Sequence, residues 1–258
     1  SIPARIMSAR VASSPLAGPM VATILVRRAT ATTVPSEASG GKGPWQNLTM
    51  SLLPANTLHW SNEDAEVHKV VVGPYENNVF VVRCRQSGEA ILIDAANEHE
   101  QLLELCQLLG VRRVLETHGH WDHIQAVPAM REAGYEVAVT KLDAPKLDEV
   151  GYDVFLDDTE VIEFGKLRMN AIHNPGHTPG SISFELAGTP LLFTGDTLFP
   201  GGPGNTSFDD ADFDTIIDSI STRLFTFPDS TIVLPGHGDD TTIGAERPHL
   251  EEWIERGW

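Results

Sequence analysis

From about His68 onward, hydrophobic residues occur in short runs that are typical of β-strands separated by turns. Val70–Val72 and Val79–Val82 flank a turn that contains Gly73 and Pro74, and Ala90–Ile93 is a continuous apolar run. Similar runs further along predict the strands Val111–Glu116, Glu136–Thr140, Glu160–Phe164, Leu167–Ile172, Ser181–Leu186, Leu191–Thr194 and Thr231–Leu234.

Helical periodicity appears between some of these strands. Leu102 and Leu109 share one face of a predicted helix, with Asn97 as its N-cap, Glu100 completing a capping box and Gly110 as its stop. Further helices are predicted over 125–133, Phe213–Leu224 and His249–Glu255. Because strands and helices alternate without a long linker, the pattern predicts one α/β domain whose sheets are covered by helices.

The first part of the chain has a different composition. Residues 1–49 contain five basic residues and one acidic residue, a net charge of +4, and are rich in Ser, Ala, Thr, Pro and Gly. Such a segment buries little apolar surface, which predicts a weakly ordered extension. An organellar transit peptide and an artefact upstream of a start at Met50 are alternatives, and Arg27-Arg28 disfavours a secretory signal. The predicted organisation is an extension over residues 1–50 and one folded domain over residues 51–258.

Charge and cysteine content exclude several classes of protein. The chain has a net charge of −18, and residues 50–258, with 13 basic and 35 acidic residues, carry −22. This excess of acid argues against a nucleic-acid partner, because phosphate binding needs a basic surface. No apolar run approaches the ~20 residues that span a membrane, so no membrane partner is expected. Cys84 and Cys106 are expected to be buried thiols in a reducing, cytoplasmic setting.

Candidate metal ligands are concentrated in the segment His118-Gly119-His120-Trp121-Asp122-His123. Two imidazoles spaced two residues apart after a predicted strand can converge on one ion, while Asp122 and His123 turn toward a neighbouring point. Borderline metals such as zinc accept imidazole and carboxylate ligands together. Three histidines and one aspartate within six residues therefore predict a metal site rather than a polar turn.

Three more candidate ligands follow predicted strands further along the chain. His177 lies on a tight loop rich in Pro and Gly, Asp196 follows the apolar run Leu191–Thr194, and His237 follows Thr231–Leu234. A carboxylate at the end of an apolar strand is costly unless it is paired or bound to a metal. Together with the first cluster, these positions indicate one composite metal site.

The ordered set of these seven residues resembles the metallo-β-lactamase superfamily of metal-dependent hydrolases, from about His68 to Trp258. The resemblance implies an αββα sandwich with the metal site at one edge between the two sheets. It also implies two divalent metal ions, with zinc favoured and iron or manganese as alternatives. The resemblance further implies that the first metal is held by His118, His120 and His177. The second would be held by Asp122, His123 and His237, and Asp196 would bridge the two.

Within the superfamily, the chain is most similar to short, single-domain glyoxalase II-type enzymes, the hydroxyacylglutathione hydrolases. Trp121 in the first motif and the run Phe193–Phe199 carry this similarity, and Asp196 argues against a true β-lactamase. About 20 residues follow His237, so the C-terminal helical domain of the long enzymes is not expected. Asn205 stands where relatives often carry Arg, which leaves the thiol carrier open.

The resemblance implies a function. A metal-bridging hydroxide would cleave S-acyl conjugates of a low-molecular-weight thiol, and Asp122 would orient it as the catalytic carboxylate. Asp94 and Thr178 are candidates for hydrogen bonding to the metal ligands and so fixing their orientation. A structural role at a strand end for Asp94 and in a turn for Thr178 agrees with the sequence equally well. The expected partner is therefore a small-molecule thioester, and a homo-oligomer is one alternative for the assembly.

Other activities of the same superfamily stay open. A persulfide dioxygenase would use one iron held by His118, His177 and Asp196, and a lactonase would use the same fold. The acidic charge disfavours a nuclease, and the retention of all seven ligands disfavours a non-catalytic binding module.

Overall fold

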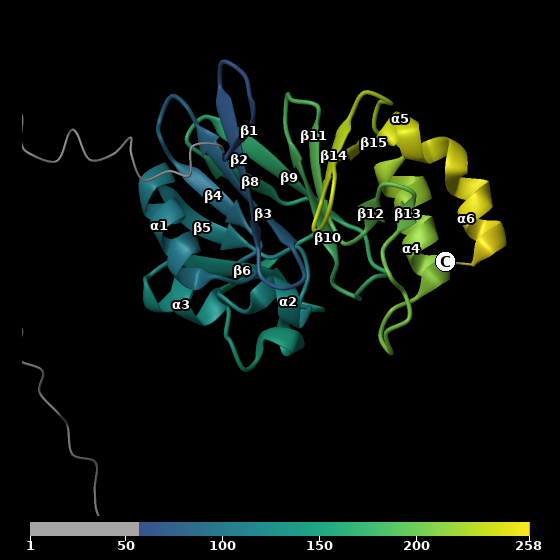
Figure 1. Cartoon of the computed structure of the whole chain (residues 1–258), viewed down its shortest axis with the longest axis horizontal. Helices are drawn as coiled ribbons and strands as arrows, with labels where there is room; N and C mark the ends of the chain where they lie inside the picture. The colour runs from purple at the N-terminus through teal and green to yellow at the C-terminus, as the bar shows by residue number, and fades with distance from the viewer. Residues whose placement is uncertain (1–56, 258) are drawn as a thin grey trace, which may run out of the picture. The chain divides into compact units, whose positions relative to one another are not determined.

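The computed structural model describes residues 57–257, in which two β-sheets are stacked between helices (Figure 1). One sheet has the strand order β1-β2-β3-β4-β5-β6-β7, and the other has the order β15-β14-β11-β10-β9-β8. No helix in this described range is long and apolar enough to cross a membrane. The predictions for residues 1–50, including the boundary at 50/51, lie outside the described residues.

The first sheet joins an antiparallel half, β1 to β4, to a parallel half, β4 to β7. Helices cross over between its parallel strands, as parallel pairing requires. In chain order its elements are β1 (Leu58–Ser61), β2 (Ala65–Val72), β3 (Asn77–Cys84), β4 (Ala90–Ile93), α1 (His99–Leu109), β5 (Val111–Leu115), α2 (Trp121–Ile124), α3 (Val127–Glu132), β6 (Glu136–Thr140), η1 (Ala144–Leu147) and β7 (Val154–Leu156).

The second sheet is followed by helices that cover its outer face (Figure 1). Its strands are β8 (Val161–Phe164), β9 (Leu167–His173), β10 (Ile182–Leu186), β11 (Leu191–Gly195), β14 (Ile232–Pro235) and β15 (Thr241–Thr242), and β12 (Leu198–Phe199) pairs with β13 (Gly202–Pro203). The helices are α4 (Phe213–Ser219), which continues into the π-helical turn η2 (Ile220–Leu224), then α5 (Ile243–Glu246), η3 (Arg247–His249) and α6 (Leu250–Arg256).

Alternation along the strands divides the hydrophobic core into layers. In β3, Val79 and Val81 pack with residues of α1 and α3, whereas Phe80 packs between the sheets. The ring of Phe80 lies edge-on to Phe193 of β11, with ring centroids 5.2 Å apart. Trp253 of α6 is buried in the cluster on the outer face of the second sheet. The layers are therefore helix, sheet, sheet and helix, as predicted for an αββα sandwich.

One local prediction, the N-cap of α1, was wrong. The N-cap of α1 is Glu98, and Asn97 instead donates a hydrogen bond from its side-chain amide to Gln125. The helix predicted over 125–133 is confirmed as α3, and α2 is a separate short helix that precedes it. The two helices are separate because the amides of Gln125 and Ala126 donate to carbonyls in the loop before α1. Tertiary hydrogen bonds therefore override the local helical preference.

The strands that precede the predicted ligands end at one edge of the sandwich. β4, β5 and β6 are parallel, while β9, β11 and β14 share one direction, because β10 is antiparallel to both β9 and β11. Two backbone hydrogen bonds join the sheets there: Ile182 N donates to Thr117 O at 2.9 Å, and Asn78 N donates to Gly236 O at 2.7 Å. The loops after β5, β9, β11 and β14 are thus brought together.

Candidate metal centre

All seven predicted ligands meet at this edge. Their nitrogen and oxygen atoms form three overlapping groups, and the atoms within each group lie within 4.8 Å of one another. The groups are His118 with His120 and His177; His118 with His123 and Asp196; and Asp122 with His123 and His237. The first and last groups have the membership expected for two neighbouring ion sites, and Asp196 lies between them.

A change from strand to helix within six residues arranges the first four ligands. The loop after β5 is extended as far as His120, whose φ and ψ are −68° and 145°. The chain then enters α2, which places Asp122 and His123 in its first turn, with His123 N donating to His120 O at 3.0 Å. The extended and helical parts therefore direct their side chains to adjacent groups.

The loop that carries His177 is held by α4. Gly176 has φ of 132°, and a Cβ at this position would overlap the backbone of Ile216. The amide of Asp212 donates to Gly176 O at 2.8 Å, and the hydroxyl of Ser219 donates to Pro175 O at 2.7 Å. Glycine is needed here because only a residue without a side chain lets α4 approach so closely.

Asp196 and His237 come from the parallel neighbours β11 and β14. Gly236 N donates to Gly195 O at 2.9 Å, which continues the strand pairing into the two ligand loops. A Cβ on Gly236 would overlap the carboxylate of Asp196. The close approach of these two backbones therefore places Asp196 beside His237, with Oδ2 3.5 Å from Nε2.

Backbone carbonyls determine which nitrogen two of the histidines offer. The Nδ1 of His177 lies 2.8 Å from Asn205 O, and the Nδ1 of His237 lies 2.8 Å from Tyr75 O. Since a carbonyl oxygen only accepts, each Nδ1 carries the hydrogen and donates it. The Nε2 atoms of both rings therefore present lone pairs to the cluster.

Asp94 performs the same task for the buried histidines, which agrees with its predicted position behind the ligands. Its Oδ2 accepts from His123 Nδ1 at 2.9 Å and from the hydroxyl of Thr117 at 2.8 Å. Because the Thr117 hydroxyl has donated its hydrogen, its oxygen accepts from His118 Nδ1, 3.0 Å away. Both histidines are thereby left with Nε2 free, an arrangement typical of metal-binding histidines.

Several of these free atoms have no ordinary partner. His118 Nε2 and Asp196 Oδ1 are buried and accept no hydrogen bond within residues 57–257. His120 Nδ1 lies 2.9 Å from His177 Nε2, and both face the cluster. Buried lone pairs set against one another are costly unless a cation or a proton lies between them. The donor set therefore fits divalent cations, which accept imidazole nitrogen and carboxylate oxygen together.

The histidines of the cluster differ in the direction in which their pKa values are shifted. Burial, reinforced by neighbouring histidines, lowers the pKa of His118 well below its usual value and that of His120 to about 4. Burial opposes ionisation of Asp196, but the charge of His123 outweighs it and lowers the carboxyl pKa. For His123 burial favours the neutral ring, yet Asp196 raises its pKa. His118 and His120 are therefore neutral, as metal ligands must be, whereas a divalent cation would have to displace the proton that Asp196 favours on His123.

Asp143 is a residue of this centre that the sequence analysis missed. It is fully buried, and its Oδ2 accepts from Gly119 N and from the hydroxyl of Thr178, both at 2.7 Å, while its Oδ1 accepts from Gly180 N at 2.8 Å. The predicted candidate Thr178 thus acts through Asp143, which ties the loop of His118 to the loop of His177. Its position shortly after the predicted strand Glu136–Thr140 was the available signal, as for Asp94 after β4.

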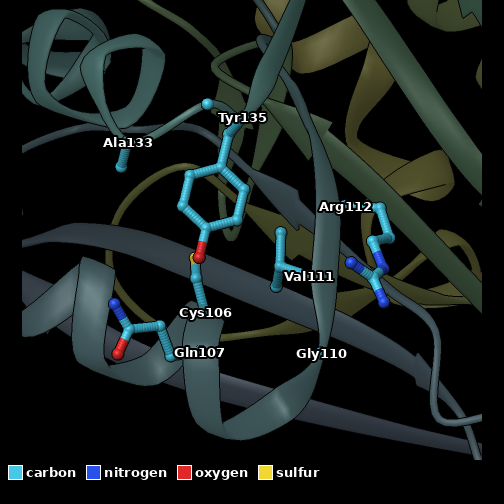
Figure 2. Close-up of a pocket in the computed structure, with 8 residues that line it drawn as sticks. Cys106, Gln107, Gly110, Val111, Arg112, Ala133 and Tyr135 are labelled. Carbon is cyan, nitrogen blue, oxygen red and sulfur yellow. The ribbon is translucent and has the colours of Figure 1, made fainter. Parts of the chain in front are cut away.

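A cavity of 510 Å³ opens over the cluster. It is lined by Tyr75, His120, Trp121, Asp122, His177, Asp196, Asn205 and Phe208. A second cavity, of 380 Å³, lies where α1 turns into β5, and Figure 2 shows its lining side chains, including Cys106 and Tyr135. Burial raises the pKa of the Cys106 thiol to about 12, so this cavity offers no thiolate nucleophile near neutral pH. The reactive groups are gathered at the metal centre.

Two characterised groups of enzymes include relatives that are similar to this chain in sequence. The chain is 34% identical over 178 residues to the hydroxyacylglutathione hydrolase GloC of Haemophilus influenzae. The aligned region covers 61% of this chain and 84% of that protein. It is 32% identical over 163 residues to the mitochondrial persulfide dioxygenase ETHE1 of Bos taurus, covering 61% of this chain and 62% of that protein.

Solved structures share the fold. The crystal structure of TTHA1623 in a di-iron-bound form matches with a TM-score of 0.63 and 32% identity, covering 69% of this chain and 96% of that one. The family description that matches residues 72–237 is the metallo-beta-lactamase superfamily. This range contains every ligand candidate, from His118 to His237. The chain therefore belongs to the metallo-beta-lactamase superfamily.

Proposed function

We propose that this protein is a metal-dependent thioester hydrolase of the glyoxalase II type. The observation that carries the proposal is the direction of the seven side chains. Hydrogen bonds orient several of the histidines so that their free nitrogens face one cluster, and the carboxylates of Asp122 and Asp196 complete this cluster. The similarity to a hydroxyacylglutathione hydrolase supports a thioester as the substrate class. His118, His120 and His177 would hold one divalent cation, Asp122, His123 and His237 a second, and Asp196 would contact both.

Bound divalent cations would supply Lewis acidity, which lowers the pKa of water and stabilises negative charge on an acyl oxygen. Burial opposes ionisation of Asp122, which is half-buried at the cavity wall, but the nearby His237, the charge of His123 and a hydrogen bond from Asn77 lower its pKa, so the carboxylate is ionised. Its carboxylate can therefore accept a hydrogen bond from the attacking water and orient it. Water adds to the acyl carbon, the C–S bond breaks, and the thiol leaves with the remaining proton.

Loss of single ligands tests the proposal. His120→Ala and Asp196→Ala should each lower the metal content, measured by elemental analysis, and abolish hydrolysis of S-acyl thioesters. His249→Ala serves as the matched control, because this histidine is exposed and pairs with Glu252 at the surface, away from the ligand cluster. Wild-type turnover in either ligand variant, or no hydrolysis of any thioester by the metal-loaded protein, would overturn the proposal.

A persulfide dioxygenase is the second candidate, since ETHE1 is nearly as similar as the hydrolase. His118, His177 and Asp196 supply two imidazoles and one carboxylate, with His177 Nε2 3.6 Å from Asp196 Oδ2. One iron per chain together with oxygen uptake on glutathione persulfide would favour this activity. About two metals per chain with thioester hydrolysis and no oxygen uptake would favour the hydrolase.

A further inference from the structure

Three exposed aromatic side chains surround the mouth of the metal centre. Tyr75, Trp121 and Phe208 are 64%, 60% and 46% exposed, and all three line the same cavity. Large aromatic side chains left in contact with water at one site are typical of surfaces that bind apolar groups.

Two of these aromatic residues adjoin different ligand groups. The Phe208 ring lies 4.7 Å from the ring of His120, at the first ligand group. Tyr75 accepts a hydrogen bond from His237 through its backbone carbonyl, at the second ligand group. A substrate carbonyl placed over the cluster would therefore have an aromatic surface next to each of its two substituents.

Positive charge at this mouth is neutralised. No lysine or arginine is among the described residues that line the cavity. Burial and His177 lower the pKa of His120, and the charge of the nearby Lys146 adds to this effect. The ammonium group of Lys146 is paired with the carboxylate of Asp210, 2.5 Å away. Asp209 adds a further acidic group next to Asp210. A substrate carboxylate would therefore find no unpaired side-chain cation among these residues.

We propose that the cavity selects thioesters in which both the acyl group and the thiol part are apolar and uncharged near the sulfur, rather than conjugates of a carboxylate-bearing thiol such as glutathione. The proposal rests on the proposed thioester hydrolysis and specifies its substrate class. Tyr75 and Phe208 contact the two substituents, and the Lys146–Asp210 pair withholds the cation that a carboxylate would need.

Matched substrates test this selectivity with the metal-loaded full chain. Hexanoyl and lactoyl thioesters of N-acetylcysteamine and of glutathione form a set of four in which the apolar area of the acyl group and the charge and size of the thiol are varied independently. We expect kcat/KM to be highest for hexanoyl-N-acetylcysteamine, about tenfold above hexanoylglutathione. Faster hydrolysis of the glutathione conjugate overturns this inference alone, whereas no hydrolysis of any of the four overturns the proposed function as well.

Two pairs of variants locate the effect. Phe208→Ala should raise KM for hexanoyl-N-acetylcysteamine about tenfold with a smaller change in kcat, because apolar contact area is lost. Phe155→Ala, at an aromatic residue of β7 that is also 46% exposed, should not. Asp210→Asn should raise kcat/KM for hexanoylglutathione by freeing Lys146, whereas Asp209→Asn removes the same charge without freeing it. Equal effects within either pair overturn the inference.

Discussion

At the scale of single residues, the metal centre depends on buried side chains that do not themselves face the cavity. Asp94 and Thr117 determine which nitrogen His123 and His118 offer, and Asp143 joins two ligand loops. The ligand types were predictable from the sequence, because histidines and aspartates at the ends of apolar strands are chemically conspicuous. The contacts of Asp143 were not, because its partners lie 24 to 37 residues away.

Replacement of Asp143 should affect both stability and metal binding. Asp143→Ala leaves the amides of Gly119 and Gly180 and the hydroxyl of Thr178 without their buried acceptor, at a cost on the order of 3 kcal/mol. We expect urea unfolding to show this loss, and elemental analysis to show less metal per chain in the folded protein.

The control is Asp158→Ala, which removes a carboxylate that pairs with Arg223 and accepts from His173 N at a more exposed position, where water can replace both partners. It should cost under about 1 kcal/mol, as exposed ion pairs do, and leave the metal content unchanged. Equal destabilisation by the two substitutions, with full metal content in both, would contradict the role given to Asp143.

At the scale of elements, the helices do more than cover the sheets. α4 holds the loop of His177 through hydrogen bonds and through its close packing on Gly176. The division of α2 from α3 has a similar origin, because the loop before α1 takes up the amides of Gln125 and Ala126. Neither arrangement is encoded in local periodicity, which describes each segment without its neighbours.

Gly176→Ala should therefore disturb the metal site from a distance. The new Cβ must push apart the His177 loop and the backbone of α4, so we expect a lower melting temperature and weaker metal retention during dialysis against a chelator. Gly188→Ala is the matched control, since Gly188 has φ of 79° but no atom within 4 Å of a new Cβ.

The control should show the cost of backbone conformation alone, about 1 kcal/mol, and normal metal retention. If both variants lose metal at the same rate, packing against α4 does not position His177.

At the scale of the whole molecule, the acidic charge is spread over the sandwich rather than concentrated in the site. Residues 50–258 contain 35 acidic residues, of which only Asp122 and Asp196 are candidate ligands. Most of the other acidic side chains lie at positions that are exposed or half-buried. The charge thus describes a solvated surface whose groups repel one another.

Salt should consequently stabilise the folded protein. Raising KCl from 0.05 M to 0.5 M shortens the distance over which charges act to a few ångströms, which weakens this repulsion more than it weakens the close ion pairs. We expect the melting temperature of the metal-loaded protein to rise by a few degrees in scanning calorimetry. A fall in melting temperature would show that the ion pairs dominate.

The sequence by itself determined the α/β class and the identity of the seven ligand candidates, since strand alternation and ligand spacing are local properties of the chain. The αββα arrangement was implied by the resemblance to the metallo-β-lactamase superfamily. The tertiary structure decided how those ligands are oriented, through Asp94, Asp143 and the carbonyls of Tyr75 and Asn205. It also decided the character of the cavity mouth, which three aromatic side chains line and where the nearby Lys146 is paired with Asp210. These features arise between segments distant in sequence, and only packing of the two sheets brings such segments within hydrogen-bonding distance.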